Sequence, residues 1–263
     1  MNPAKSRETK AIAIFDIDGV IRDVGGSYRR AIADTVNHFT DNQYCPTLAD
    51  IDRLKSEGIW NNDWEASREL IYRYWESQER DRQAVDLDYE GLVEFFQSRY
   101  QGTAGDRFNG YIVNEPLLVS AEYFQSLTQE GVLWGFFSGA MRAEAKYALE
   151  YRLGLSELAL IAMEDAPGKP DPTGLFQVIE QLGGDRSIPV FYVGDTVADM
   201  KTIARAQAEQ PERTWIAIGV LPPHVQESTE VQEAYTQQLY QAGARQVLRN
   251  VEELTVAQID RLA

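Results

Sequence analysis

The strongest constraint on the fold is an alternation of short apolar runs and helical patterns along the chain. Residues 11–17, 132–138, 189–195 and 214–220 contain unbroken runs of apolar side chains, and shorter candidate strands lie at 159–163 and 246–249. Such runs are typical of parallel strands that are covered on both faces. Amphipathic stretches with helical spacing separate the runs between residues 117 and 220. Because alternating strands and helices form βαβ units, we predict an α/β protein with a doubly wound parallel sheet.

The segment between residues 28 and 112 departs from this alternation. It has helical periodicity in three places, near residues 28–39, 70–75 and 92–96, and no convincing strand pattern. About 85 helical residues placed directly after the first strand indicate a separate subdomain. We therefore predict an α/β core domain formed by residues 1–24 and 114–263, with a helical cap domain at residues 25–113.

The charge of the chain limits the class of partner. The formal net charge is −16, which disfavours binding to nucleic acids and to anionic membranes because like charges repel. No segment has the length of a membrane span, the first ten residues do not resemble a signal peptide, and a single cysteine, Cys45, excludes an intrachain disulfide. We expect a cytoplasmic protein, and the sequence leaves its oligomeric state open.

Polar residues follow the predicted strands at the points where the strands end. Asp16 and Asp18 end the first run, Ser138 ends the second, and Asp195 ends the third. Lys169 lies in a Gly-Lys-Pro-Asp-Pro loop after the candidate strand at 159–163. In an open α/β sheet, ligands bind beyond the carboxyl ends of the strands. We therefore expect these side chains to meet at one edge of the sheet.

The order of these motifs resembles a known family. FDIDGV, FFSGA, GKPDP and VGDTVAD follow one another as they do in the haloacid dehalogenase superfamily of phosphotransferases. The chain is similar to the phosphatase branch whose helical cap follows the first strand, the phosphoglycolate phosphatase-like proteins. The resemblance extends from residue 11 to about residue 255, and its first and last motifs are the specific ones. It implies a phosphatase with a Rossmann-like core.

The acidic residues favour a magnesium site. In an extended chain residues i and i+2 point to the same side, so Asp16 and Asp18 can share one site, where two carboxylates without a metal would repel. Mg²⁺ relieves that repulsion, since it prefers oxygen ligands, and Asp195 supplies a further carboxylate. The resemblance adds the backbone carbonyl of Asp18 as a ligand. Asp199, four residues after Asp195, is a further candidate metal ligand. We expect it rather to orient Lys169, or to order the water molecules around the metal.

The expected reaction is phosphoryl transfer through a covalent intermediate. Asp16 attacks phosphorus, and Asp18 protonates the leaving alkoxide and later takes a proton from the hydrolytic water. Mg²⁺ and Lys169 offset the negative charge. The Ser138 hydroxyl and the Gly139 N–H hold phosphoryl oxygens at a βα turn. The predicted function is a Mg²⁺-dependent phosphatase of a small phosphorylated metabolite.

The sequence leaves several alternatives open. Arg22 is a candidate substrate-binding residue, or else an exposed arginine paired with Asp23. A sugar phosphomutase uses the same core, and a receiver-type signalling domain also clusters aspartates with a lysine. A dehalogenase has no need of the second acid, Asp18. A phosphonate hydrolase of this branch would need a cap lysine, and Lys55 is the only lysine between residues 11 and 145.

Overall fold

The computed structural model describes residues 9–60, 62–105 and 108–263. The chain divides into two compact units. One unit consists of Met1–Asp23 and Leu117–Ala263 and contains the sheet, and the other is the helical stretch Val24–Pro116. In the sequence, the helical stretch directly follows the first strand and the turn after it.

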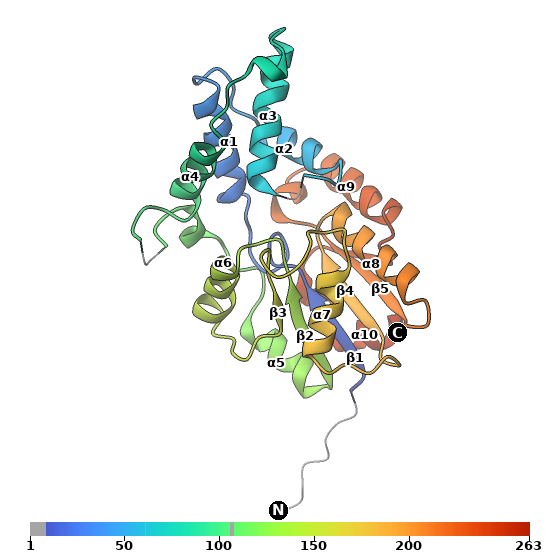
Figure 1. Ribbon diagram of the computed structural model, residues 1–263. Coiled ribbons are helices and arrows are strands. Elements are labelled where there is room, and N and C mark those ends of the chain that lie inside the picture. Colours follow the sequence, from blue (N-terminus) through green and yellow to red (C-terminus); the bar gives the residue numbers. More distant parts are fainter. Residues whose placement is uncertain (1–8, 61, 106–107) are drawn as a thin grey trace, which may run out of the picture. The chain divides into compact units, whose positions relative to one another are not determined.

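A single parallel sheet organises the first unit (Figure 1). The order of its six strands is β3-β2-β1-β4-β5-β6, and every neighbouring pair is parallel. The strands are β1 (Ala11–Phe15), β2 (Val132–Phe137), β3 (Leu160–Ile161), β4 (Val190–Gly194), β5 (Trp215–Val220) and β6 (Gln246–Leu248). This confirms the predicted α/β fold, including both short candidate strands. The first strand is two residues shorter than predicted, because the chain turns after Phe15.

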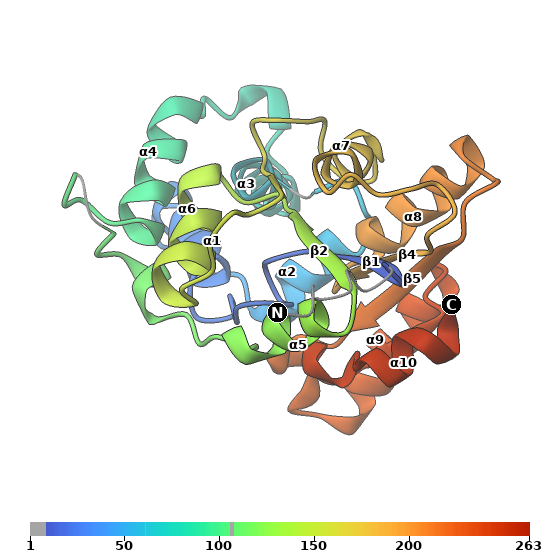
Figure 2. The same cartoon turned by 90° about the horizontal axis from the view of Figure 1, so that it is seen from below.

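Helices cover both faces of this sheet, which explains why its strands are apolar throughout. One core contains Ala11, Ala13 and Phe15 of β1, packed with apolar residues of α5 (Ala121–Gln129) and α10 (Val256–Leu262). The alternate residues Ile12 and Ile14 face a second core. The second core is completed by α7 (Thr173–Gln181), α8 (Val197–Glu209) and α9 (Thr229–Gln241). Figure 2 shows α7 and α8 on one face and α5 and α10 on the other.

The remaining helical segments of the first unit are short. The chain leaves β2 through α6 (Arg142–Lys146), which continues as a π-helical turn (Tyr147–Arg152). Two 3₁₀ turns, Pro223–Gln226 and Val251–Glu253, follow β5 and β6. None of the helices in the described part of the chain is both long and apolar enough to cross a membrane.

The second unit is helical throughout, with one more α-helix than the sequence pattern indicated. Its helices are α1 (Tyr28–Phe39), α2 (Leu48–Lys55), α3 (Asp63–Ser77) and α4 (Tyr89–Tyr100), with 3₁₀ turns at Arg82–Ala84 and Tyr111–Asn114. The additional helix is α2. Its apolar stripe is short, but Thr47 and Asp50 form a capping box at its start. That local signal, and not periodicity, marks the helix in the sequence.

Candidate active site

The predicted site residues of the first unit gather at the carboxyl edge of its sheet. Asp16 follows β1, Ser138 follows β2 and Asp195 follows β4. In the sheet, Phe15 pairs with Phe136 on one side and with Val193 on the other, so these three strand ends are neighbours. The Asp16 N–H donates to the Val193 carbonyl at 2.8 Å, which extends the pairing by one residue. The sheet register thus places the predicted residues on adjacent strand ends.

Three carboxylates form a buried cluster at this edge. Oxygen atoms of Asp16, Asp195 and Asp199 all lie within 4.8 Å of one another, and all three residues are buried. Lys169 reaches into the cluster from the loop before α7, with its Nζ 2.8 Å from Asp16 Oδ1 and 2.7 Å from Asp199 Oδ1. Its side chain is only 8% exposed, so these ion pairs are shielded from solvent.

Burial and charge shift the pKa values of this cluster. Burial raises the pKa of Asp16 to about 7 against the attraction of Lys169, and the neighbouring Asp199 and Asp18 raise it further. Burial also opposes the charge on Lys169, but Asp16 and Asp199 outweigh that effect and raise the pKa of the lysine. Lys169 therefore stays protonated, and one cation is shared between two carboxylates. The cluster carries uncompensated negative charge when its acids are ionised.

Asp199 is held from both sides by donors of the protein itself. Its Oδ1 accepts hydrogen bonds from Lys169 and from the Tyr192 hydroxyl, the latter at 3.1 Å. Its Oδ2 accepts from the Thr196 N–H at 2.9 Å and the Thr196 hydroxyl at 2.5 Å. Asp199 and Thr196 thereby form the capping box at the start of α8. Because both oxygens are engaged, this geometry favours the role of holding Lys169 over direct metal binding.

Tyr192 and Phe137 are site residues that sequence reasoning missed. The Lys169 Nζ lies 5.5 Å from the ring centroids of both Tyr192 and Phe137, so the two rings form an aromatic floor under the ammonium group. Both lie inside apolar strand runs, where a tyrosine and a phenylalanine look like ordinary core residues. Thr196 was detectable, since Thr196 and Asp199 have the spacing of a capping box.

Asp18 lies beside the cluster, and its carboxylate contacts Arg22. The carbonyl of Ile17 accepts hydrogen bonds from the N–H groups of Val20, Ile21 and Arg22, so the chain curls directly after Asp16. This curl brings Arg22 Nε to 2.7 Å from Asp18 Oδ1. The two-residue alternation of an extended strand does not apply here, because the strand has ended at Phe15. Side-chain oxygens of Asp18 are accordingly absent from the buried acidic cluster that the described residues form.

Arg22 is fully buried, with 0% of its side chain exposed. The alternative in which it is an exposed surface arginine is therefore wrong. A direct contact between Arg22 and the substrate stays a prediction. Arg22 Nε contacts the carboxylate of Asp18.

Ser138 and Gly139 occupy the turn after β2. Ser138 is buried and its hydroxyl oxygen accepts a hydrogen bond from the Ala140 N–H at 3.1 Å, which leaves the hydroxyl proton available as a donor. Gly139 is exposed, and apart from its chain neighbours no described residue has an atom within 4 Å of the position that a side chain would take there. A turn with a free hydroxyl proton and an open backbone suits an anionic group.

The donor set of the cluster fits a hard divalent cation. Asp16 and Asp195 offer buried carboxylate oxygens and no nitrogen or sulfur ligand, which is the chemistry that Mg²⁺ selects. Asp16 Oδ1 already accepts from Lys169 and from the Ile17 N–H at 2.8 Å. Among the described residues no donor contacts Asp16 Oδ2. Negative charge in excess of the single lysine gives such a cation a favourable electrostatic site.

Gly19 lets the backbone approach the carboxylate of Asp195 closely. It has φ of +75°, and a Cβ added there would lie 2.6 Å from Asp195 Cγ. We expect Gly19→Ala to displace Asp195 and lower the apparent affinity for Mg²⁺ by about 10- to 100-fold. Activity measured against metal concentration checks this.

Gly183→Ala is the matched control for Gly19→Ala. Gly183 also has a positive φ, +65°, but apart from its chain neighbours no described residue has an atom within 4 Å of an added Cβ. Both variants should lose about 1 kcal/mol of stability from backbone strain, and Gly19→Ala should lose more because its Cβ displaces Asp195. Only Gly19→Ala should lose metal affinity. Equal metal affinity in the two variants would contradict the placement of Asp195.

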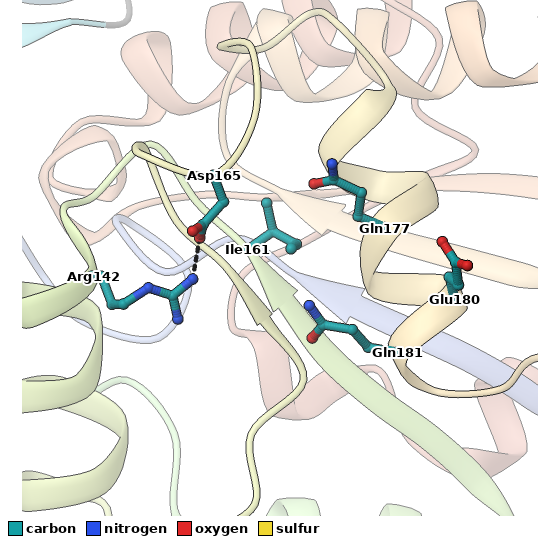
Figure 3. Close-up of a pocket in the computed structure, with 6 residues that line it drawn as sticks. All are labelled: Arg142, Ile161, Asp165, Gln177, Glu180 and Gln181. Carbon is teal, nitrogen blue, oxygen red and sulfur yellow. Dashed lines mark hydrogen bonds and ion pairs between the residues drawn. The ribbon is translucent and has the colours of Figure 1, made fainter.

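A pocket lies beside the edge strand β3, outside the acidic cluster (Figure 3). Two of its lining side chains accept hydrogen bonds from backbone N–H groups on the open side of the strand. Gln181 Oε1 accepts from the Leu160 N–H at 3.2 Å, and Asp165 Oδ2 accepts from the Ala162 N–H at 2.7 Å. Asp165 also pairs with Arg142, as the dashed line in Figure 3 marks. These contacts cap the edge of the sheet against further strand pairing, so we assign the pocket no part in the reaction.

Known structures share this fold. A hydrolase from Pseudomonas syringae superposes with a TM-score of 0.65 at 17% identity, covering 97% of this chain and 100% of that one. A phosphonoacetaldehyde hydrolase like protein from Oleispira antarctica has a TM-score of 0.67 at 20% identity, covering 96% and 92%. A phosphatase from Thermococcus thioreducens has a TM-score of 0.61 at 20% identity, covering 85% and 98%. At these identities the likeness establishes a common fold.

Sequence comparison identifies the family. A curated protein from Phytophthora nicotianae, named imidazoleglycerol-phosphate dehydratase, is 30% identical over 242 residues, which cover 89% of this chain and 49% of that protein. The chain thus spans about half the length of this relative. The family model of the haloacid dehalogenase-like hydrolases matches residues 10–207, which include the acidic cluster and Lys169. The chain therefore belongs to the haloacid dehalogenase-like hydrolase family.

Proposed function

We propose that this protein is a Mg²⁺-dependent phosphatase that acts on a small phosphorylated metabolite through an aspartyl-phosphate at Asp16. The observation that carries the proposal is the environment of the Asp16 carboxylate. One oxygen is fixed by Lys169 and the Ile17 N–H, while no described residue donates to the other. A carboxylate anchored through one oxygen presents a single oriented atom for reaction.

The carboxylates of Asp16 and Asp195 would hold the divalent ion, together with the backbone carbonyl of Asp18 that the family resemblance suggests. When bound, Mg²⁺ supplies positive charge that offsets the charge of the phosphoryl group. Lys169 supplies a second positive charge, fixed by Asp199 and supported by the aromatic floor. Ser138 and Gly139 bind phosphoryl oxygens through the hydroxyl proton and the backbone N–H.

The chain then carries out two displacements. Asp16 forms a bond to phosphorus as the bond from phosphorus to the leaving oxygen breaks, and Asp18 gives that oxygen a proton. In the second displacement water attacks phosphorus, Asp18 takes the proton of the water, and the bond to Asp16 breaks. Lys169 stays protonated, because Asp16 and Asp199 both favour the cation before the reaction and the carboxylate of Asp199 still pairs with it once Asp16 carries the phosphoryl group.

We propose a small, compact substrate and a cap role for the helical unit Val24–Pro116. The relative from Phytophthora nicotianae is named for a small phosphorylated compound, an imidazoleglycerol phosphate. Phosphate monoesters of small alcohols, sugars and acids are accordingly the first compounds to test. The net charge of −16 argues against nucleic acids and anionic membranes as partners of the proposed enzyme, because like charges repel.

Phosphonate hydrolysis is disfavoured by the environment of Lys55. That chemistry needs a lysine free to attack a carbonyl group. The Lys55 Nζ lies 2.7 Å from Asp63 Oδ1 and 3.4 Å from the Trp60 carbonyl, so it is already engaged within the helical unit. The presence of Asp18 argues against a dehalogenase, and membership of a hydrolase family leaves the receiver-type signalling domain without support.

The test of this function is a hydrolysis assay on 4-nitrophenyl phosphate and a panel of metabolite phosphates. We expect release of inorganic phosphate that requires Mg²⁺ and stops when a chelator removes it. Isomerised sugar phosphate in place of free phosphate would favour a phosphomutase. Stoichiometric phosphorylation without turnover would favour a receiver-type signalling domain. Activity unaffected by the chelator would contradict the proposal.

A further inference from the structure

A buried arginine contacts the proposed acid–base residue. Arg22 Nε donates to Asp18 Oδ1 at 2.7 Å, and the side chain of Arg22 is 0% exposed while that of Asp18 is 25% exposed. A short charge-assisted hydrogen bond that is shielded on one side fixes the geometry of its acceptor. No described residue donates to the second oxygen of Asp18, Oδ2.

The backbone around Arg22 is fixed on both sides. Its N–H donates to the Ile17 carbonyl at 3.2 Å and its carbonyl accepts from the Gly19 N–H at 2.9 Å. Arg22 also forms an isolated antiparallel bridge with Leu117, where the chain re-enters the first unit. The backbone of Arg22 is therefore fixed in the turn that follows Asp16, and its buried side chain reaches Asp18 from that turn.

We propose that Arg22 is a positioning residue for proton transfer, which occupies Oδ1 of Asp18 so that Oδ2 is the oxygen that exchanges the proton. This inference rests on the proposed phosphatase function. In the acid form, Oδ1 is the carbonyl oxygen and accepts from Arg22, while Oδ2 carries the proton. As the phosphorus–oxygen bond breaks, that proton moves to the leaving alkoxide. In the hydrolytic step Oδ2 receives a proton from water.

Leaving groups that differ in their need for a proton test this role. The nitrophenolate of 4-nitrophenyl phosphate leaves without being protonated, whereas the alkoxide of 2-glycerophosphate needs a proton to leave. Only 2-glycerophosphate therefore depends on proton donation. The ratio of the two kcat/KM values reports the phosphorylation step. We expect Arg22→Met to lower kcat/KM for 2-glycerophosphate at least about tenfold more than for 4-nitrophenyl phosphate.

Arg22→Lys separates the Nε contact from charge and volume. A lysine keeps the buried positive charge, but places a methylene group where arginine has Nε, so we expect the same selective loss for 2-glycerophosphate. This variant also keeps the test valid if Arg22→Met does not fold. If Arg22→Lys restores both substrates to wild-type rates, the Nε contact is not what matters and the proposal is overturned.

Two controls complete the design. Arg213→Met removes another buried arginine of the same unit, one that donates to the Asp185 carbonyl at 2.7 Å, and it should change stability without changing the substrate ratio. In an Asp18→Asn background, Arg22→Lys should have no further effect on the ratio, and additive losses would overturn the proposal. Failure of the phosphatase function itself would show separately, as absent Mg²⁺-dependent activity in the wild-type protein.

Discussion

Replacing Asp16 by asparagine is expected to abolish turnover and leave the fold intact. A carboxamide has the shape of the carboxylate but does not attack phosphorus, and loss of a covalent nucleophile should lower kcat by at least about 1,000-fold. Steady-state assays with 4-nitrophenyl phosphate and Mg²⁺ measure this. Asp165→Asn is the matched control, since Asp165 follows β3 but pairs with Arg142 outside the cluster. Retained Mg²⁺-dependent activity in Asp16→Asn would contradict the assignment.

The same substitution should affect stability in a pH-dependent way in the metal-free protein. Because burial raises the pKa of Asp16 to about 7 from the ordinary value of 3.8, its ionised form is disfavoured in the folded state. This destabilisation is fully present above pH 7 and is lost as the pH falls from 7 toward 4. Thermal unfolding with a chelator should therefore show Asp16→Asn most stabilised, relative to wild type, above pH 7. A constant difference across this pH range would argue against a strained, buried Asp16.

Lys169→Met should damage both stability and activity. The substitution leaves Asp16 and Asp199 facing each other in a buried site without their shared cation. Removing one partner of a buried ion pair destabilises a protein by about 3–5 kcal/mol, and urea unfolding measures that loss directly. Turnover should also fall, because the positive charge beside the phosphoryl group is gone.

Two further variants isolate the cause. Lys169→Met combined with Asp199→Asn removes the uncompensated carboxylate, so it should regain stability without regaining activity. Lys146→Met removes the exposed ion pair with Glu150, in which Lys146 Nζ lies 3.2 Å from Glu150 Oε1. This variant should change the free energy of unfolding by about 0.5 kcal/mol or less. If Lys169→Met unfolds like the Lys146 variant, Lys169 is not a buried charge-compensating residue.

Much of the fold follows from the sequence because its signals are local and repeated. Runs such as 132–138 and 214–220 are apolar at every strand position, which only a sheet covered on both faces requires, and the structure has strands at both. The helix α2 was missed because its eight residues carry too short an apolar stripe for periodicity to register. Its capping box was the better signal.

The site could be predicted in part, since the ends of parallel strands meet at one edge. That rule brought Asp16, Asp195 and Lys169 together correctly. It gave no information about the turn after Phe15, which directs Asp18 toward Arg22 and depends on hydrogen bonds to the Ile17 carbonyl. The contact between Tyr192 and Lys169 could not be predicted either, because a tyrosine inside an apolar run gives no indication of a polar partner.

Covalent trapping tests most directly whether Asp16 carries the phosphoryl group. Enzyme mixed with a slight excess of substrate and Mg²⁺ is quenched in acid within the first turnover, reduced with borohydride and analysed by peptide mass spectrometry. An acyl phosphate at Asp16 would be reduced to homoserine at that one position, and we predict this product. Phosphate on another residue such as Ser138, or product release with no covalent intermediate at any time point, would contradict it.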